Sequence, residues 1–340
     1  MNITWGLLSK YKNELYGFSI LWIMLFHGII TKNIALPKSI NFLKKFLIYG
    51  NIGVEVFLFL SGICLYFSLK KNDNIVNFYW KRIIRVFIPF LIIDGLWWAY
   101  SYIYEQNNLL KFIENITFYS FWVTHDQTVW FIALIIPLYF VYPYIYKFLL
   151  DKENCLIRIC FFIVLSYVLC LTFSYLNQHM YRGIEIALTR IPIFLLGCYC
   201  GVLVFENRKI SKTVLIISII SFIFGVFLLQ NYSLIKSFRI QYLFIGPSVV
   251  IWLTILLEYC NSERINSQLS LWGGLSLELY LSHVIFRIVF MQSKYFTSNK
   301  IANFSEYIIL CIFGALIVSY CVAAISDYLN RYLLQNNIKC

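Results

Sequence analysis

The run "LYGFSILWIMLFHG", Leu15 to Gly28, decides the fold class of this chain. Its side chains are almost all apolar, so it lacks the charged face of a surface helix in a soluble protein. The rest of the chain has the same character, being 61% hydrophobic and 13% charged, with a mean hydropathy of +0.74. A soluble domain is about 25% charged. We therefore expect lipid to surround much of the chain, and apolar runs within a bilayer to be α-helices, because helices satisfy their own backbone polar groups.

Ten apolar runs are long enough to cross a bilayer, which needs roughly 20 helical residues. They cover residues 15–32, 46–69, 82–104, 128–149, 155–176, 186–205, 213–230, 239–258, 270–290 and 306–333. The predicted fold is an all-α polytopic membrane bundle, a single domain over 1–340 without a soluble domain. Residues 105–127 and 291–305 are expected to be loops on one side, and "KKNDN", "DKEN" and "ENRKISK" tight turns on the other.

The distribution of Lys and Arg predicts the orientation. With ten spans both termini lie on one side, and that side holds the larger share of the 28 basic residues. Loops rich in Lys and Arg tend to stay in the cytoplasm, so both termini are expected there, in a multi-pass protein of the cell membrane. Lys38, Lys44 and Lys45 are exceptions on the opposite side.

Charge and cysteine content exclude two other classes of function. The net charge of +12 is spread over two aqueous faces without a nucleic-acid-binding motif, so the lipid surface is the expected partner and nucleic acid is not. The 10 cysteines lie mostly within the apolar runs, at spacings that match no zinc or redox motif. We expect no metal and no permanently bound cofactor.

The first span carries one ionisable ring, that of His27. A lone histidine inside a membrane is either a structural residue hydrogen-bonded between helices or a functional group such as a general base. Tyr16 precedes His27 by eleven residues. Eleven steps of about 100° return to nearly the same face, so both side chains are expected to lie on one stripe of the helix, about 16 Å apart along its axis.

Polar residues of the next two spans also have alternative interpretations. Arg82 and Arg85 share a face near the cytoplasmic end of the third span, where they serve either as a positive-inside anchor or as a clamp for phosphate. Glu55 within the second span needs a partner or a proton to handle, because an unpaired carboxylate in a membrane is costly. Ser61, followed by Gly62, is expected to mark close helix packing rather than a nucleophile.

Later spans contain further buried polar candidates. Glu278 and Ser282 form one i,i+4 pair and His283 and Arg287 another, on different stripes of the ninth span. Two polar stripes predict burial within the bundle, against other helices or a water-filled cavity. Arg190 in the sixth span is expected to bind a phosphate or to neutralise Glu55 or Glu278, and the sequence leaves these alternatives open.

Six motifs in sequence order resemble the acyltransferase-3 family of integral-membrane O-acyltransferases. The first is "LYGFSILWIMLFH", which ends at His27, and the second is "GVEVFLFLSG", Gly53 to Gly62. The third is "FYWKRIIRVFIP" with Arg82 and Arg85, and the fourth is the pair Trp130-Phe131 with a downstream Tyr-Pro. The last two are "RIPIFLLG" and "LSLELYLSH". The resemblance covers nearly the whole chain.

The resemblance implies transfer of an acyl group, usually acetyl, from cytoplasmic acetyl-CoA to a hydroxyl of a cell-envelope carbohydrate. It makes His27 the catalytic base, with Glu55 as a second catalytic candidate. Arg82 and Arg85 would meet the phosphates of CoA, and Tyr16 would lie along the donor route. The supporting candidates are Ser61, Trp130, Arg190, Glu278 and His283. Acetyl-CoA, a carbohydrate acceptor, the bilayer and glycan-assembly proteins are the expected partners.

One position departs from the family pattern. Where relatives have an arginine eleven residues before the histidine, this chain has Tyr16, which supplies no fixed positive charge. Arg190 or the Arg82 and Arg85 pair would then take that role, or donor binding differs, or activity is weak. Two other hypotheses are a transporter or flippase of glycan precursors, and a regulatory membrane protein without chemistry.

Overall fold

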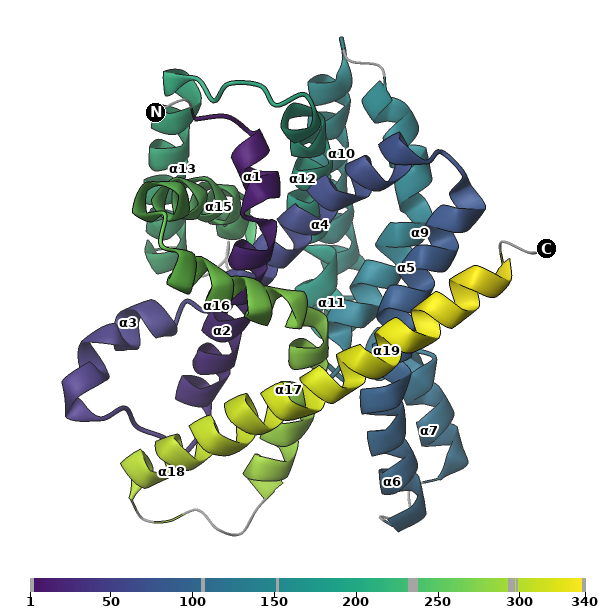
Figure 1. Cartoon of the computed structure of the whole chain (residues 1–340), viewed down its shortest axis with the longest axis vertical. Helices are drawn as coiled ribbons and strands as arrows, with labels where there is room; N and C mark the ends of the chain where they lie inside the picture. The colour runs from purple at the N-terminus through teal and green to yellow at the C-terminus, as the bar shows by residue number, and fades with distance from the viewer. Residues whose placement is uncertain are drawn as a thin grey trace.

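The computed structural model describes residues 3–104, 108–150, 153–231, 238–292, 297 and 299–337. These residues form helices joined by short connections, and no strand occurs among them (Figure 1). The elements are α1 (Gly6–Lys10), α2 (Lys12–Ile30), η1 (Lys38–Leu43), α3 (Lys44–Leu47), α4 (Ile52–Lys71), α5 (Ile75–Phe90), η2 (Leu91–Gly95), α6 (Leu96–Tyr104), α7 (Leu109–Ile116), α8 (Tyr119–Trp122), α9 (Trp130–Leu150), α10 (Cys155–Leu176), α11 (Gln178–Leu188), α12 (Ile191–Phe205), α13 (Lys212–Asn231), α15 (Ile240–Cys260), α16 (Glu263–Gly274), α17 (Ser276–Gln292), α18 (Lys300–Tyr307), η3 (Ile308–Gly314) and α19 (Ala315–Asn337).

The number of membrane spans agrees with the sequence prediction. Within the described ranges, nine helical stretches are long and apolar enough to cross a membrane, and one bent helix pair makes a tenth. The stretches Ile75–Tyr104, Gln178–Phe205 and Lys300–Tyr332 each combine two or more consecutive elements. No part of the described chain forms a separate soluble domain, so the predicted all-α membrane bundle is confirmed.

Three segments differ from the prediction, one of them being the expected loop 291–305, in which helix α18 already begins at Lys300. The run expected at 270–290 is not one straight span, because α16 and α17 meet at an angle of 69°. Two consecutive glycines, Gly273 and Gly274, end α16, and glycine is a poor helix former. The expected loop 105–127 contains the helices α7 and α8 wherever it is described, since short amphipathic stretches such as "LLKFIENI" still favour helix.

Several predicted cytoplasmic segments lie on one side of the bundle. Thr4 near the N-terminus forms an isolated antiparallel bridge with Lys209, in the turn between α12 and α13. The ammonium group of Lys10 pairs with Glu258 near the end of α15, with Nζ and Oε2 2.5 Å apart. This agrees with the predicted grouping of these segments. The cytoplasmic identity of that side remains a prediction.

The central helix α4 packs closely against α12. Most side chains of α4 are buried. A Cβ atom on Gly197 of α12 would overlap the carbonyl oxygen of Phe59, and one on Gly62 of α4 would meet the backbone of Phe194 and Cys198. Small residues let membrane helices approach this closely. The expectation that Gly62 marks close packing is confirmed.

A second close crossing joins α2 to α16. A Cβ on Gly17 would overlap the carbonyl oxygen of Leu269, and one on Gly273 would overlap that of Asn13. The two glycines thus allow the backbones of α2 and α16 to touch. Because α16 then bends into α17, this crossing fixes the start of α17 beside α2.

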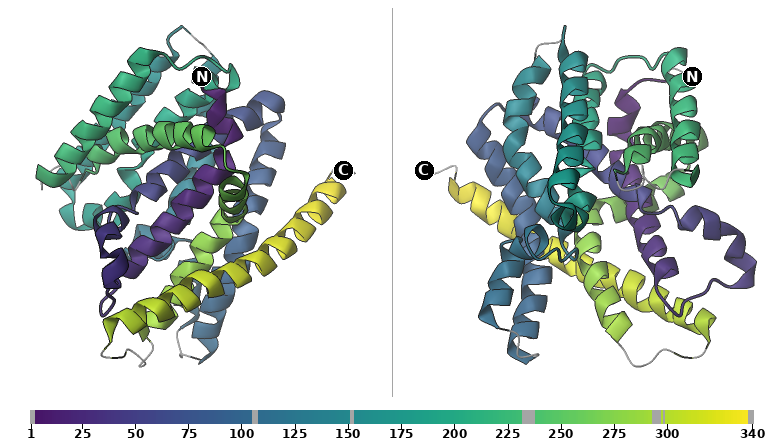
Figure 2. Two further views of the ribbon diagram at one scale, coloured as in Figure 1. Left: turned by 60° about the vertical axis from the view of Figure 1, so that its left-hand side comes forward. Right: turned by 180° about the vertical axis from the view of Figure 1, so that it is seen from behind.

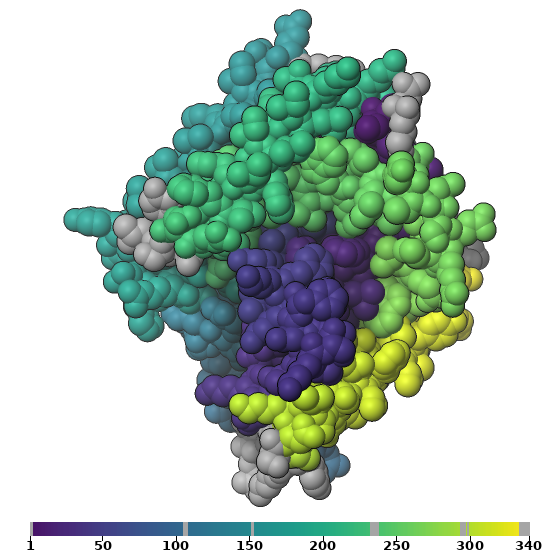
Figure 3. Space-filling model, turned by 90° about the vertical axis from the view of Figure 1, so that its left-hand side faces the viewer, coloured from purple at the N-terminus to yellow at the C-terminus, as the bar shows by residue number. Residues whose placement is uncertain are grey.

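The remaining elements frame this core. α18, η3 and α19 follow one another in a long rod that crosses the molecule diagonally (Figures 1 and 2). The segment with η1 and α3 bulges over α2 beside α18 (Figure 3), where the Ala35 amide donates a hydrogen bond to the Lys300 carbonyl. The ring of Phe46 in this segment stacks on Trp22 of α2, with centroids 4.7 Å apart.

Candidate active site

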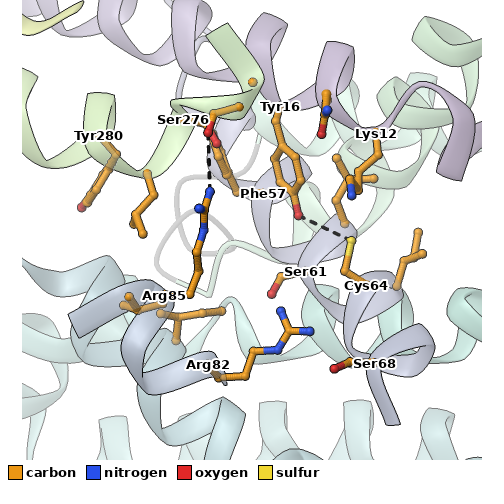
Figure 4. A pocket seen from close by; sticks show the side chains of 18 of the residues that line it. Lys12, Tyr16, Phe57, Ser61, Cys64, Ser68, Arg82, Arg85, Ser276 and Tyr280 are labelled. Carbon is orange, nitrogen blue, oxygen red and sulfur yellow. Dashed lines mark hydrogen bonds between the residues drawn. The ribbon is translucent and has the colours of Figure 1, made fainter. Parts of the chain in front are cut away.

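A cavity of about 530 Å³ lies among α2, α4, α5, α9 and the junction of α16 and α17 (Figure 4). We call it the Arg82 cavity. Four of its described lining residues are basic, namely Lys12, Lys71, Arg82 and Arg85, and none of them is acidic. They come from the first turn of α2, the last turn of α4 and the middle of α5. The interior of the cavity is mostly apolar and aromatic, so its charge is concentrated where these three elements meet.

The start of α5 places both arginines on the cavity wall. Asn74 caps the helix by accepting a hydrogen bond from the Asn77 amide, with a distance of 2.9 Å. Arg82 and Arg85 follow two turns later, and their spacing of three residues directs them to one side. This juxtaposition agrees with the predicted shared face.

The two arginines are only lightly engaged within the protein. The buried Nε of Arg82 has no hydrogen-bond partner among the described residues. Arg85 donates to the Gly274 carbonyl at 3.5 Å and lies 3.9 Å from the exposed carboxylate of Asp327. A buried donor without a partner carries a free-energy cost. Arg82 is therefore able to donate a hydrogen bond to an anion that enters the cavity.

Tyr16 lies in the wall of the same cavity, as the labelled side chains show (Figure 4). Its hydroxyl lies 4.0 Å from Sγ of Cys64, and its ring lies 5.2 Å from that of Phe57. Lys12, four residues earlier on the same face of α2, also lines the cavity. Lys12 was not among the residues predicted for the site, although its i,i+4 spacing to Tyr16 signals it. A positive charge therefore lies one turn from Tyr16.

His27 and His283 form a direct hydrogen bond between α2 and α17. Nδ1 of His27 lies 2.9 Å from Nε2 of His283, and the rings are nearly parallel at 17°. Nδ1 of His283 lies 2.9 Å from the Leu279 carbonyl. A carbonyl oxygen only accepts, so His283 carries its proton on Nδ1 when neutral, and its Nε2 accepts from Nδ1–H of His27. This chain of hydrogen bonds leaves the lone pair of neutral His27 on Nε2.

The histidine pair lies next to the inner end of the Arg82 cavity rather than in its wall. Ile23, one turn before His27 on the same face of α2, lines the cavity, but His27 is not among the lining residues. Tyr280 also lines it, and the Tyr280 ring contacts that of His283 with centroids 5.9 Å apart. The stripe predicted from Tyr16 to His27 thus passes through Ile23, and the structure extends it to Lys12.

Arg190 pairs with Glu55, which decides among the alternatives that the sequence left open. Nε of Arg190 lies 2.8 Å from Oε1 of Glu55, and the two side chains are 3% and 1% exposed. Nη1 of Arg190 donates to the Ile186 carbonyl at 2.6 Å, and the guanidinium lies 4.8 Å from the centroid of the Trp130 ring. Neither Arg190 nor Glu55 lines the Arg82 cavity. The predicted catalytic role of Glu55 stays a prediction.

Two other predicted supporting residues lie near the cavity. Ser61 lines it, with its hydroxyl 3.5 Å from that of Tyr139. Glu278 is fully buried in the first turn of α17, and neither carboxylate oxygen has a hydrogen-bond partner among the described residues. Glu278 follows the lining residues Ser276 and Leu277 but does not line the cavity itself.

The fold and the cavity define a multi-pass membrane protein with a basic site that reaches inward to a histidine pair. A family model described as an acyltransferase domain matches residues 15–324, nearly the whole chain. The chain therefore belongs to the acyltransferase-3 family, as its motifs indicate, and is a membrane O-acyltransferase. No curated protein and no solved structure matches the chain significantly. Family membership does not favour the transporter alternative.

Proposed function

We propose that the protein transfers an acetyl group from cytoplasmic acetyl-CoA to a hydroxyl of a cell-envelope or surface polysaccharide, or of its lipid-linked precursor. The observation that carries this proposal is the charge of the Arg82 cavity, with four basic lining residues and no acidic one among those described. Guanidinium groups match phosphate oxygens in geometry and charge. The phosphates of CoA would lie at Arg82, Arg85, Lys12 and Lys71.

The length and lining of the cavity fit the rest of this donor. From Lys12 to Ile23 the cavity follows α2 over eleven residues, about 16 Å of helix. Its inner part is lined by apolar and aromatic side chains, among them Phe57, Phe131 and Tyr280. An extended, uncharged pantetheine arm would lie along this stretch. The thioester would then reach the inner end, beside the histidine pair.

The histidine pair supports a general-base mechanism. Nε2 of His27 removes the proton from the acceptor hydroxyl as its oxygen attacks the thioester carbonyl. The tetrahedral intermediate collapses, the C–S bond breaks, and the CoA thiolate takes the proton back from the imidazolium of His27. The products are the acetyl ester and free CoA. In this mechanism Glu55 holds Arg190 in place and transfers no proton.

Donor binding is tested with purified protein in detergent. We expect acetyl-CoA to raise the thermal midpoint of the wild type, and S-acetylpantetheine, which lacks the phosphates, to have a much smaller effect. Arg82→Ala should weaken acetyl-CoA binding by about 10- to 100-fold, the value of a hydrogen bond to a charged group. Lys147→Ala is the matched control, because Lys147 is basic but does not line the cavity. Equal effects of the two donors would contradict the proposed phosphate contacts.

The chemistry is tested in cells. Mass spectrometry of envelope glycans should show one acetyl group fewer when the gene is deleted. His27→Ala should abolish this O-acetylation while the purified variant is still stabilised by acetyl-CoA, because the base is lost and the donor site is retained. Normal O-acetylation in cells that carry only the His27→Ala variant would refute the assignment of His27.

A further inference from the structure

A second cavity of about 310 Å³ lies among α6, α7, the segment before α9 and the last turns of α17. We call it the Trp97 pocket. Aromatic rings supply much of its wall, from Trp97, Trp98, Tyr102 and Phe112. Its polar lining includes the carboxylate of Asp126 and the amides of Asn115 and Gln292. Most of these residues lie in or beside the loops that are predicted on the side opposite the termini.

The Trp97 pocket and the Arg82 cavity are both lined by helix α17 and by the membrane span Ile75–Tyr104. Val86 lines the cavity, and Trp97 lines the pocket eleven residues later on the same continuous span, about 16 Å further along its axis. On α17, Tyr280 lines the cavity and Ile288 the pocket. The two sites therefore follow each other along α5–α6 and α17.

Little protein separates the two sites at the start of α9. Thr128 lines the pocket, and Phe131, only three residues later, lines the cavity. The rings of Phe131 and Tyr280 contact each other with centroids 5.2 Å apart. Tyr280 also contacts His283, the partner of His27. The partition between cavity and pocket thus lies beside the proposed catalytic base.

The Trp97 pocket differs from the Arg82 cavity in the charge of its lining, and this difference determines the class of ligand it can bind. It contains one basic residue, Lys111, and one acidic residue, Asp126, among the described lining residues, so it has no excess charge for phosphates. Aromatic faces pack against the C–H faces of a pyranose ring, and carboxylate and amide oxygens accept hydrogen bonds from its hydroxyls. Asp126 is held in place, because its Oδ1 accepts from the amide and the hydroxyl of Thr128, at 2.8 and 2.5 Å.

We propose that the Trp97 pocket binds a saccharide unit of the acceptor. This inference rests on the proposed acetyl transfer and adds the site at which the carbohydrate is recognised. The acceptor then approaches the partition of Phe131 and Tyr280 from the side opposite the donor. Two substrates of different charge thus meet at His27 without sharing an entrance.

The test uses membrane vesicles that contain the full chain and the native envelope glycan, supplied with acetyl-CoA labelled in the acetyl group. We expect Trp97→Ala and Asp126→Asn each to lower incorporation of label into glycan by about tenfold, the value of one aromatic or hydrogen-bond contact. Trp97→Phe should retain more activity, because it keeps a ring. Asp126→Asn keeps Oδ1 for Thr128, so the local fold is preserved. Tyr119→Ala is the matched control, an exposed aromatic residue outside the lining.

Thermal stabilisation by acetyl-CoA, measured on each purified variant, separates the two proposals. If the Trp97 pocket binds the saccharide, Trp97→Ala and Asp126→Asn keep this stabilisation by acetyl-CoA but incorporate less labelled acetyl into glycan. Wild-type incorporation by both variants would overturn the saccharide site and leave the proposed acetyl transfer standing. A wild-type protein that transfers no label from acetyl-CoA would instead refute the proposed function itself.

Discussion

Replacing Arg190 by leucine should destabilise the protein strongly, because it leaves the carboxylate of Glu55 buried without its partner. The two side chains are 3% and 1% exposed and are joined by a hydrogen bond of 2.8 Å. Removing one member of a buried ion pair costs about 3–5 kcal/mol. The Ile186 carbonyl loses its bond to Arg190 in addition, and Trp130 loses its cation contact. We therefore expect Arg190→Leu to lie at the upper end of this range.

The double variant Glu55→Leu/Arg190→Leu provides the matched comparison. It removes both charges and fills their volume with apolar atoms, a change that is often nearly neutral for buried pairs. The measurement is the free energy of unfolding in detergent of the wild type, both single variants and the double variant. We expect a coupling energy between Glu55 and Arg190 of at least about 2 kcal/mol. Additive effects within about 0.5 kcal/mol would refute it.

The same four proteins test the predicted catalytic role of Glu55. If Glu55 acts only as the partner of Arg190, the folded double variant retains acetyl transfer. If Glu55 takes part in the chemistry, the double variant is stable and binds acetyl-CoA but transfers no acetyl group. The assay is the incorporation of labelled acetyl into glycan by membrane vesicles.

Three further substitutions probe the site and the fold. His283→Leu removes the acceptor for Nδ1–H of His27 and should lower acetyl transfer about 100-fold, with unchanged thermal stabilisation by acetyl-CoA. His283→Gln should retain more activity, because its amide oxygen accepts a hydrogen bond. Equal losses of activity in the two variants would contradict the positioning role of His283. Tyr16→Arg adds a fifth cation to the cavity and should strengthen thermal stabilisation by acetyl-CoA but not by S-acetylpantetheine. A similar gain in thermal stabilisation with both ligands would argue against phosphate binding. Gly17→Val forces α2 away from Leu269 and should lower the free energy of unfolding by about 1–3 kcal/mol. Gly274→Ala, with open space around its Cβ, should leave it nearly unchanged, and a loss for Gly17→Val as small as that for Gly274→Ala would show that the crossing tolerates bulk.

Much of the fold follows from the sequence because membrane spans depend on local composition. The apolar runs predicted the helices, and the clusters "KKNDN" and "ENRKISK" predicted the turns after α4 and α12. The bend between α16 and α17 was not predicted, although Gly273 and Gly274 mark it. It depends on the contact of Gly273 with the backbone of α2, and a tertiary contact of this kind leaves no periodic pattern in the sequence.

The candidate site was only partly predictable for a related reason. The cost of burying charge identified Glu55, Arg190, His27 and His283 as important, but not which of them are neighbours. His27 and His283 are 256 residues apart in the chain, and Glu55 and Arg190 are 135 residues apart. Pairings at such separations depend on how the helices are arranged. The Lys12 contribution, in contrast, was readable from its spacing to Tyr16.

The contact between Arg85 and the Gly274 carbonyl joins residues that are 189 positions apart. During synthesis, the helices that carry Tyr16 and Arg82 enter the membrane long before the junction of α16 and α17 is made. The basic wall of the cavity therefore exists for most of translation without the part contributed by Gly273, Ser276 and Tyr280. A chain that stops before this junction would contain His27 but not His283. Completion of the ninth span is thus the step in biogenesis at which His27 first gains its hydrogen-bond partner.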